Sequence, residues 1–244
     1  SGFEFILGGS PITTNDFTWN ISANLSINNN EIKSIREGID EIVVGSQFGY
    51  SGSTVTMKLL EGEAYGNIFG SSYERLGADP DNIFLDRSLP IIIGTNGFPV
   101  RTGTQLVLGN AVPKWIGGIR NDFTYRDFEF SFLIDFRTGL EQYNQYANFL
   151  SAFGKNEFTE AREDFRVFEG VLADGSTNTK EVWLGQGEGP DGVDYGAGYW
   201  RNYYRTTSEN FVNDASYIKL RNITLGYNLN PDLLEQTPFR TARV

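Results

Sequence analysis

The segment Phe17 to Ile27, FTWNISANLSI, decides the fold, because every second residue in it is apolar and small polar residues fill the alternate positions. Successive side chains of a β-strand point to opposite faces, so the pattern predicts a strand with one apolar and one hydrated face. About eleven residues is also the length with which a tilted strand crosses the hydrocarbon layer of a membrane. A half-buried strand of a soluble antiparallel sandwich alternates in the same way, so this segment alone leaves both interpretations open.

A second alternating pattern separates the two interpretations. The runs 115–125 and 128–137 flank a turn at 125–127 and predict a β-hairpin. The return run has five large apolar side chains on one face and charges of both signs among the residues of the other. Such a charged face suits the water-filled interior of a membrane barrel, and its charges are expected to pair across strands. The sequence therefore favours a barrel over a sandwich.

The same alternation assigns candidate residues to each face of the predicted wall. The predicted lipid-facing residues are aromatic: Phe17, Trp19, Phe128, Phe130, Phe132 and Phe136. The predicted lumen-lining residues are polar or charged: Asn20, Asn24, Arg120, Asp122, Glu129, Asp135 and Arg137. Both assignments depend on one strand phase, so they hold or fail together.

Composition supports strands and turns over helices. Of the 244 residues, 39% are hydrophobic and 14% aromatic, and 28 are glycine. A run of about eighteen apolar residues is absent from the sequence, so any membrane crossing is expected to use strands. The predicted fold class is all-β, an antiparallel portion of a transmembrane β-barrel with long extracellular loops, one of them helical.

Residue content also excludes much catalytic chemistry. Cysteine and histidine are absent, which removes thiol nucleophiles, disulfides, His/Cys zinc sites and Ser-His-Asp triads. Glu129 and Asp135 would lie about 20 Å apart on one strand, too far for glycoside cleavage. The net charge of −11 disfavours nucleic acid. We expect no enzyme, no cofactor and no metal, and interpret the acidic segment 79–86 as a turn because it lacks the glycine and terminal glutamate of a calcium loop.

The remaining segments are interpreted mainly as loops. Residues 31–45 are expected to continue as strand beyond the membrane edge, and 71–113 to be irregular. A period of three to four over 138–153 predicts an amphipathic helix, capped by Gly154. Residues 174–198 are glycine-rich and acidic, which predicts a long exposed loop.

Two features near the C-terminal end remain open to more than one interpretation. The cluster Tyr199, Trp200, Tyr203 and Tyr204 could stack on a sugar or peptide, or could pack within the loop or at a membrane interface. In the strand 214–229 the apolar phase changes, which indicates either a bulge near 221–222 or a first half that lies above the membrane.

Several motifs resemble the SusC/RagA-type TonB-dependent outer-membrane transporters and occur in that family's order. They are GEAYGNIFG at 62–70, LGNAVPKW at 108–115, FEFSFLIDFRTG at 128–139 and DASYIKLRNITLGYNL at 214–229, followed by PDLL at 231–234 and TPF at 237–239. Together they cover nearly the whole chain.

The resemblance implies that residues 1–244 are the C-terminal part of a plugged barrel of about twenty-two strands in the bacterial outer membrane of Bacteroidota. The plug, the TonB box and the first barrel strands would then lie outside this sequence. The implied partners are a SusD-like surface lipoprotein, the remainder of the transporter, the TonB complex acting through the plug, membrane lipid, and an oligosaccharide or peptide substrate. Nucleic acid is not among them.

Aromatic loop residues become candidate contacts for the substrate or the lipoprotein: Tyr143, Tyr146, Trp200, Tyr203 and Tyr204. The alternative from the residues themselves is a secreted β-sandwich that binds glycans on the aromatic cluster at 199–204.

Overall fold

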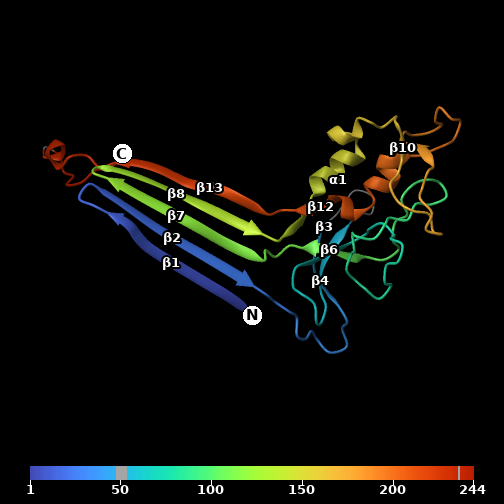
Figure 1. Ribbon diagram of the computed structural model, residues 1–244, viewed down its shortest axis with the longest axis horizontal. Coiled ribbons are helices and arrows are strands. Elements are labelled where there is room, and N and C mark those ends of the chain that lie inside the picture. Colours follow the sequence, from blue (N-terminus) through green and yellow to red (C-terminus); the bar gives the residue numbers. More distant parts are fainter. Residues whose placement is uncertain (48–53, 236) are drawn as a thin grey trace. The chain divides into compact units, whose positions relative to one another are not determined.

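The computed structural model describes residues 1–47, 54–235 and 237–244 (Figure 1). The chain forms two compact units, and each is assembled from separate stretches of sequence. The sheet unit comprises Ser1–Asn30, Pro113–Leu140 and Ala215–Val244. The loop unit comprises Glu31–Val112 and Glu141–Asp214.

The sheet unit is built on five long antiparallel strands in the order β1-β2-β7-β8-β13 (Figure 1). Their bounds are β1 (Gly2–Thr13), β2 (Phe17–Asn28), β7 (Trp115–Tyr125), β8 (Phe128–Thr138) and β13 (Tyr217–Tyr227). A short 3-10 turn, η4 (Pro231–Leu234), follows. The predicted antiparallel β architecture is therefore confirmed, whereas the described strands form an open sheet and not a closed barrel.

The register keeps the apolar residues of neighbouring strands on one face. Trp19 lies opposite Phe123, and Phe123 lies opposite Phe130 on the next strand. Residues that lie directly opposite each other in an antiparallel pair share a face. One face of the sheet is therefore mainly apolar and the other mainly polar.

A bulge in β13 explains the change of apolar phase in the sequence. The register with β8 shifts between Arg221 and Thr224, and Asn222 has a φ of 51°. Asparagine tolerates this left-handed conformation better than most residues. Because the bulge inserts an extra residue, Leu220 and Leu225 both reach the apolar face. The predicted bulge near 221–222 is confirmed.

The loop unit contains short strands and helical turns. One sheet has the order β3 (Ile42–Gln47), β4 (Val55–Leu59), β5 (Asn67–Gly70) and β6 (Leu106–Asn110). Two further pairs join β9 (Glu141–Tyr143) to β12 (Val212–Asp214) and β10 (Phe165–Val167) to β11 (Glu181–Trp183). The helical elements are α1 (Gln145–Ala152), the 3-10 turns η1 (Glu157–Thr159) and η3 (Ser208–Phe211), and the π-helix η2 (Trp200–Tyr204). Within the described ranges, none of the helices combines the length and apolar character needed to cross a membrane.

Two hydrophobic clusters hold the loop unit together. The first contains Ile93, Phe98, Phe168, Val182, Leu184, Tyr199 and Trp200. The second contains Val55, Ile68, Leu108, Tyr143, Phe211 and Val212. Each cluster joins residues that are far apart in the sequence, so the loop unit is a packed body of its own.

This packing corrects three expectations from the sequence. Residues 31–41 contain no strand, and β3 begins at Ile42. The helix predicted over 138–153 begins at Gln145, although Gly154 has the expected left-handed φ of 63°. The segment 174–198 is not wholly exposed, because 182–184 is buried in the first cluster.

Candidate functional site

The polar face of the sheet carries pairs of opposite charges. Arg120 Nη2 lies 2.7 Å from Asp122 Oδ1 on the same strand. Arg221 Nε lies 3.2 Å from Asp135 Oδ2, and Arg243 Nη1 lies 2.9 Å from Glu129 Oε2. Because these side chains remain exposed or partly exposed, each pair contributes little to the stability of the fold. Their effect is to cover this face with fixed, nearly balanced charge.

The apolar face carries a row of aromatic rings across the strands. Trp19 stacks on Phe123 with ring centroids 5.8 Å apart, and Phe123 lies 6.1 Å from both Phe130 and Phe132. At the edge of the sheet Leu225 is 72% exposed, and in the centre Phe130 is still 40% exposed. The described part of the sheet unit therefore leaves a broad apolar surface uncovered.

Asn121 is a polar residue on this apolar face that was not predicted from the sequence. Asn121 lies opposite both Ile21 and Phe132, in the middle of the apolar face. It is buried, and its Oδ1 accepts a hydrogen bond of 3.1 Å from Trp19 Nε1. The two polar groups thus satisfy each other where water is excluded. The position of Asn121 in the apolar phase of its strand was the available signal.

The register separates the predicted wall residues into two groups, one on each face of the sheet. The aromatic face contains Phe17, Trp19, Phe128, Phe130, Phe132 and Phe136. The opposite face contains Asn20, Asn24, Arg120, Asp122, Glu129, Asp135 and Arg137. Which face meets lipid and which meets water stays a prediction.

The aromatic loop residues proposed as ligand contacts differ widely in exposure. Tyr143 and Trp200 are buried in the two clusters of the loop unit, and Tyr203 and Tyr204 are half-buried. Tyr146 on α1 is 74% exposed. Most of these aromatic side chains therefore pack within the loop unit. Tyr146 is the one most accessible to a ligand.

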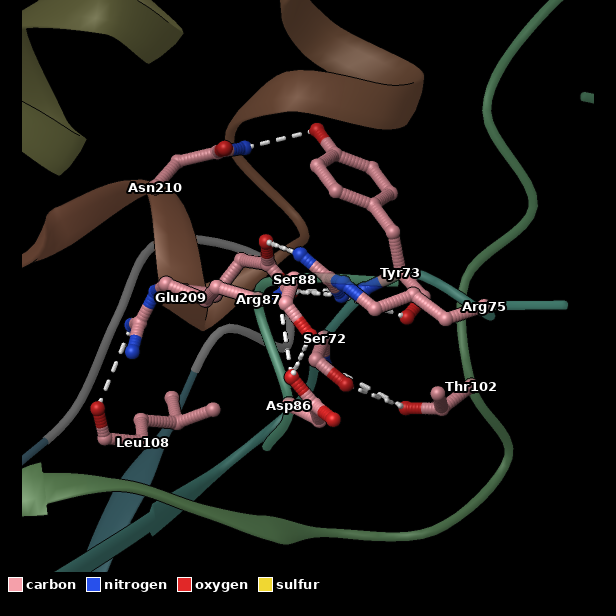
Figure 2. Close-up of polar contacts among 10 residues, drawn as sticks. All are labelled: Ser72, Tyr73, Arg75, Asp86, Arg87, Ser88, Thr102, Leu108, Glu209 and Asn210. Atoms are coloured by element: carbon pink, nitrogen blue, oxygen red, sulfur yellow. Dashed lines mark hydrogen bonds and ion pairs between the residues drawn. The ribbon is translucent and has the colours of Figure 1, made fainter. Parts of the chain in front are cut away.

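A buried ion pair ties together two distant segments of the loop unit (Figure 2). Arg75 binds Glu209 in a two-pronged contact, with N–O distances of 2.9 and 3.2 Å. The side chains are only 6% and 9% exposed. Glu209 Oε2 also accepts a hydrogen bond of 2.8 Å from the backbone N–H of Tyr73. We call this arrangement the Arg75–Glu209 clamp.

Tyr73 continues the clamp through its side chain. Its hydroxyl accepts a hydrogen bond of 2.7 Å from Asn210 Nδ2 (Figure 2). Burial raises the pKa of Tyr73 to about 12, although the Asn210 bond lowers it in part. The hydroxyl therefore remains protonated at neutral pH. Hydrogen bonds and the Arg75–Glu209 ion pair together hold the segment 71–75 against Glu209 and Asn210.

The acidic segment 79–86 has the contacts of a series of turns. Oδ1 atoms of Asp79 and Asn82 accept hydrogen bonds from backbone N–H groups two residues further on. Asp86 does the same with Ser88, and the Ser88 hydroxyl and amide lower the pKa of the Asp86 carboxyl. These side-chain oxygens stabilise local turns.

The loop unit also contains a partly open cavity of about 430 Å³, which we call the Trp/Arg cavity. Its lining includes Arg162, Glu163, Trp183, Gln186, Trp200 and Arg201. A volume of this size falls in the range of small-ligand sites. The indole N–H of Trp183 donates to the carbonyl of Glu163 at 2.6 Å, which fixes one wall.

We expect Gly185→Ala to destabilise this wall. A Cβ at Gly185 would collide with the indole ring of Trp183, so the ring must move. Such overpacking typically costs about 1–3 kcal/mol. Gly103 offers a matched control, because a Cβ there meets nothing within 4 Å. Hydrogen exchange at residues 181–184 should accelerate in Gly185→Ala and stay unchanged in Gly103→Ala; equal rates in the two variants would contradict the packing described.

Comparison with known proteins places this geometry in context. A scan for matching family models found none. The chain is 27% identical over its full length to TonB-dependent receptor P3 of Formosa agariphila, of which it covers 23%. It is 28% identical over 93% of its length to TonB-dependent receptor SusC of Bacteroides thetaiotaomicron, of which it covers 20%. The chain thus spans about a quarter or less of the curated relatives it matches.

A solved structure has the same fold over nearly the whole chain. The structure of the RagAB peptide transporter matches 99% of this chain and 24% of its own, with a TM-score of 0.56 and 16% identity. These relatives are receptors and transporters and not enzymes, which agrees with the prediction for this chain. Along nearly its whole length, the chain is thus similar in sequence to SusC and other TonB-dependent receptors and similar in fold to the RagAB peptide transporter.

Proposed function

We propose that this chain is part of the barrel wall and outer loops of a TonB-dependent transporter in the bacterial outer membrane. The observation that carries the proposal is the sheet, whose register keeps mainly apolar residues on one face and mainly polar or charged residues on the other over five strands. Strands of 11 or 12 residues match the length that a tilted strand needs to cross the hydrocarbon layer.

The chemistry of the proposed function is selective passage. Asn20, Asn24 and the charge pairs of the polar face would line an aqueous lumen, and the aromatic face would contact lipid. The loop unit would lie outside the membrane. The transported molecule would be an oligosaccharide or a peptide, and a SusD-like lipoprotein would cover the outer entrance. Energy would come from TonB through the plug of the complete transporter.

The alternative, a secreted glycan-binding sandwich, has less support. A sandwich buries the apolar face of each sheet against a second sheet. Within the described part of the sheet unit, no second sheet covers the apolar face. The aromatic residues that would form the glycan platform, Tyr199 and Trp200, are buried.

Membrane fractionation of cells that produce the intact protein tests the proposal. We expect the protein in the outer-membrane fraction, where alkaline carbonate and urea leave it and detergent extracts it, because lipid contacts along the apolar face hold it. A peripheral lipoprotein-bound control should be released by urea. If buffer alone released this protein from the membranes, the barrel proposal would be wrong.

A further inference from the structure

Charge is distributed very unevenly between the two units. The sheet unit contains eight basic and eight acidic residues, whereas the loop unit contains 12 basic and 23 acidic residues. The net charge of −11 therefore belongs to the loop unit. Against this acidic background, the Trp/Arg cavity has two arginines and one glutamate in its lining. The local balance of charge is thus the reverse of that of the unit around it.

The two arginines of this cavity have no acidic partner. In the ranges that the structure describes, no carboxylate oxygen lies within 4.0 Å of the charged nitrogens of Arg162 or Arg201. By contrast, Arg75 in the same unit is paired with the carboxylate of Glu209 in the clamp. Two unpaired guanidinium groups at one cavity repel each other, and an anion between them would remove that cost.

Arg162 is also held in place. Its Nε donates to the carbonyl of Thr159 and its Nη2 to the carbonyl of Gly154, both at 3.2 Å. An arginine has five N–H donors, so these two bonds fix the side chain and leave further donors available. A guanidinium fixed in this way loses little entropy when it binds an oxyanion.

The neighbouring wall has a surplus of donors. Trp200 Nε1 and Arg201 Nε have no hydrogen-bond partner among the residues that the structure describes, although both atoms are covered. Both atoms are hydrogen-bond donors, so only an acceptor group can satisfy them. Trp183 and Trp200 supply flat apolar surface beside them.

We propose that the Trp/Arg cavity binds an oxyanion, a carboxylate or a sulfate ester, carried by a molecule of about monosaccharide size. Arg162 and Arg201 would pair with the oxyanion, and the indole edges of Trp183 and Trp200 would contact the apolar part of the ligand. Glu163 opposes an anion and would keep the affinity modest. This site goes beyond the proposed transport role and does not depend on it.

Binding measurements on the intact protein in detergent test the site. The probes are galacturonate, galactose 6-sulfate, neutral galactose and N-acetylglutamate. Calorimetry measures the affinity of each probe at low and at high salt. We expect the oxyanion-bearing probes to bind more tightly than galactose, and salt to weaken them. Preference for galacturonate over N-acetylglutamate would identify a sugar as the carrier, and the reverse would identify a peptide; either supports an oxyanion site.

Three variants of cavity residues test the direction in which the affinity changes. Arg201→Gln and Arg162→Gln should each weaken binding of the preferred anion about 10- to 100-fold. Glu163→Gln should strengthen it, which a folding defect cannot imitate. The exposed Arg36, which does not line the cavity, provides the matched control Arg36→Gln. Equal affinity for galactose, no binding of any anion, or unchanged binding in Arg201→Gln would overturn the proposal, whatever fractionation shows about the barrel.

Discussion

Arginine in place of Phe132, near the middle of β8, is expected to abolish most assembly of the protein into the outer membrane, whereas arginine in place of the adjacent Ser131 is expected to leave assembly nearly normal. Phe132 lies on the apolar face against Phe123 and Phe130, and Ser131 lies on the polar face opposite Asp122. On a lipid-facing strand, arginine near the bilayer midplane costs about 2–4 kcal/mol, or roughly 30- to 800-fold in the folding equilibrium.

The amount of folded protein extracted from outer membranes by detergent is the measurement for this pair. Phe132→Leu separates the cost of the charge from the loss of ring contacts, which are worth about 0.5–1.5 kcal/mol per aromatic pair. We expect Phe132→Leu to resemble Ser131→Arg much more closely than Phe132→Arg. Equal losses for the two arginine variants would show that the faces do not differ in their surroundings.

Removal of one partner of the Arg75–Glu209 clamp should cause the largest loss of stability in the loop unit. Arg75→Met leaves the carboxylate of Glu209 buried without its charge partner, which typically costs about 3–5 kcal/mol. The double variant Arg75→Met/Glu209→Gln removes both charges and keeps an acceptor for the backbone N–H of Tyr73. We expect the double variant to recover most of the lost stability.

The exposed pair Lys33–Glu31 is the matched control for the clamp. Its side chains are 77% and 50% exposed, so Lys33→Met should cost less than about 1 kcal/mol. Hydrogen exchange at residues 71–75 and 206–210 reports local opening of the clamped segments. Fast exchange in Arg75→Met, with slow exchange in the double and control variants, is the expected result. If Arg75→Met exchanged as slowly as Lys33→Met, the clamp would have no stabilising role.

The sheet was predictable from the sequence because residues close together in the chain determine its strands and its turn. A period of two fixes which side chains share a face, and the short turn at 126–127 fixes the register of β7 and β8. Even the bulge at Asn222 was visible as a change of apolar phase. Asn121 was the exception, since its partner Trp19 lies on another strand.

The loop unit was less predictable because distant residues determine its structure. Glu209 is 134 residues from Arg75, and no local pattern links them. Val182 and Leu184 lie in a glycine-rich acidic segment, and their burial comes from contact with Phe98 and Trp200 in the first cluster. The Trp/Arg cavity likewise forms from separate stretches, so its chemistry became visible only after folding.

Spin labels on alternate residues of β8 test the central claim most directly, because the chain contains no cysteine of its own to interfere. Single cysteine variants at 128–132, labelled in the intact protein in native outer membranes, report collision with oxygen in lipid and with a nickel chelate in water. The account predicts high oxygen exposure at 128, 130 and 132, and high nickel exposure at 129 and 131. The reverse alternation, or nickel exposure at every position, would contradict the assignment of the aromatic face to lipid.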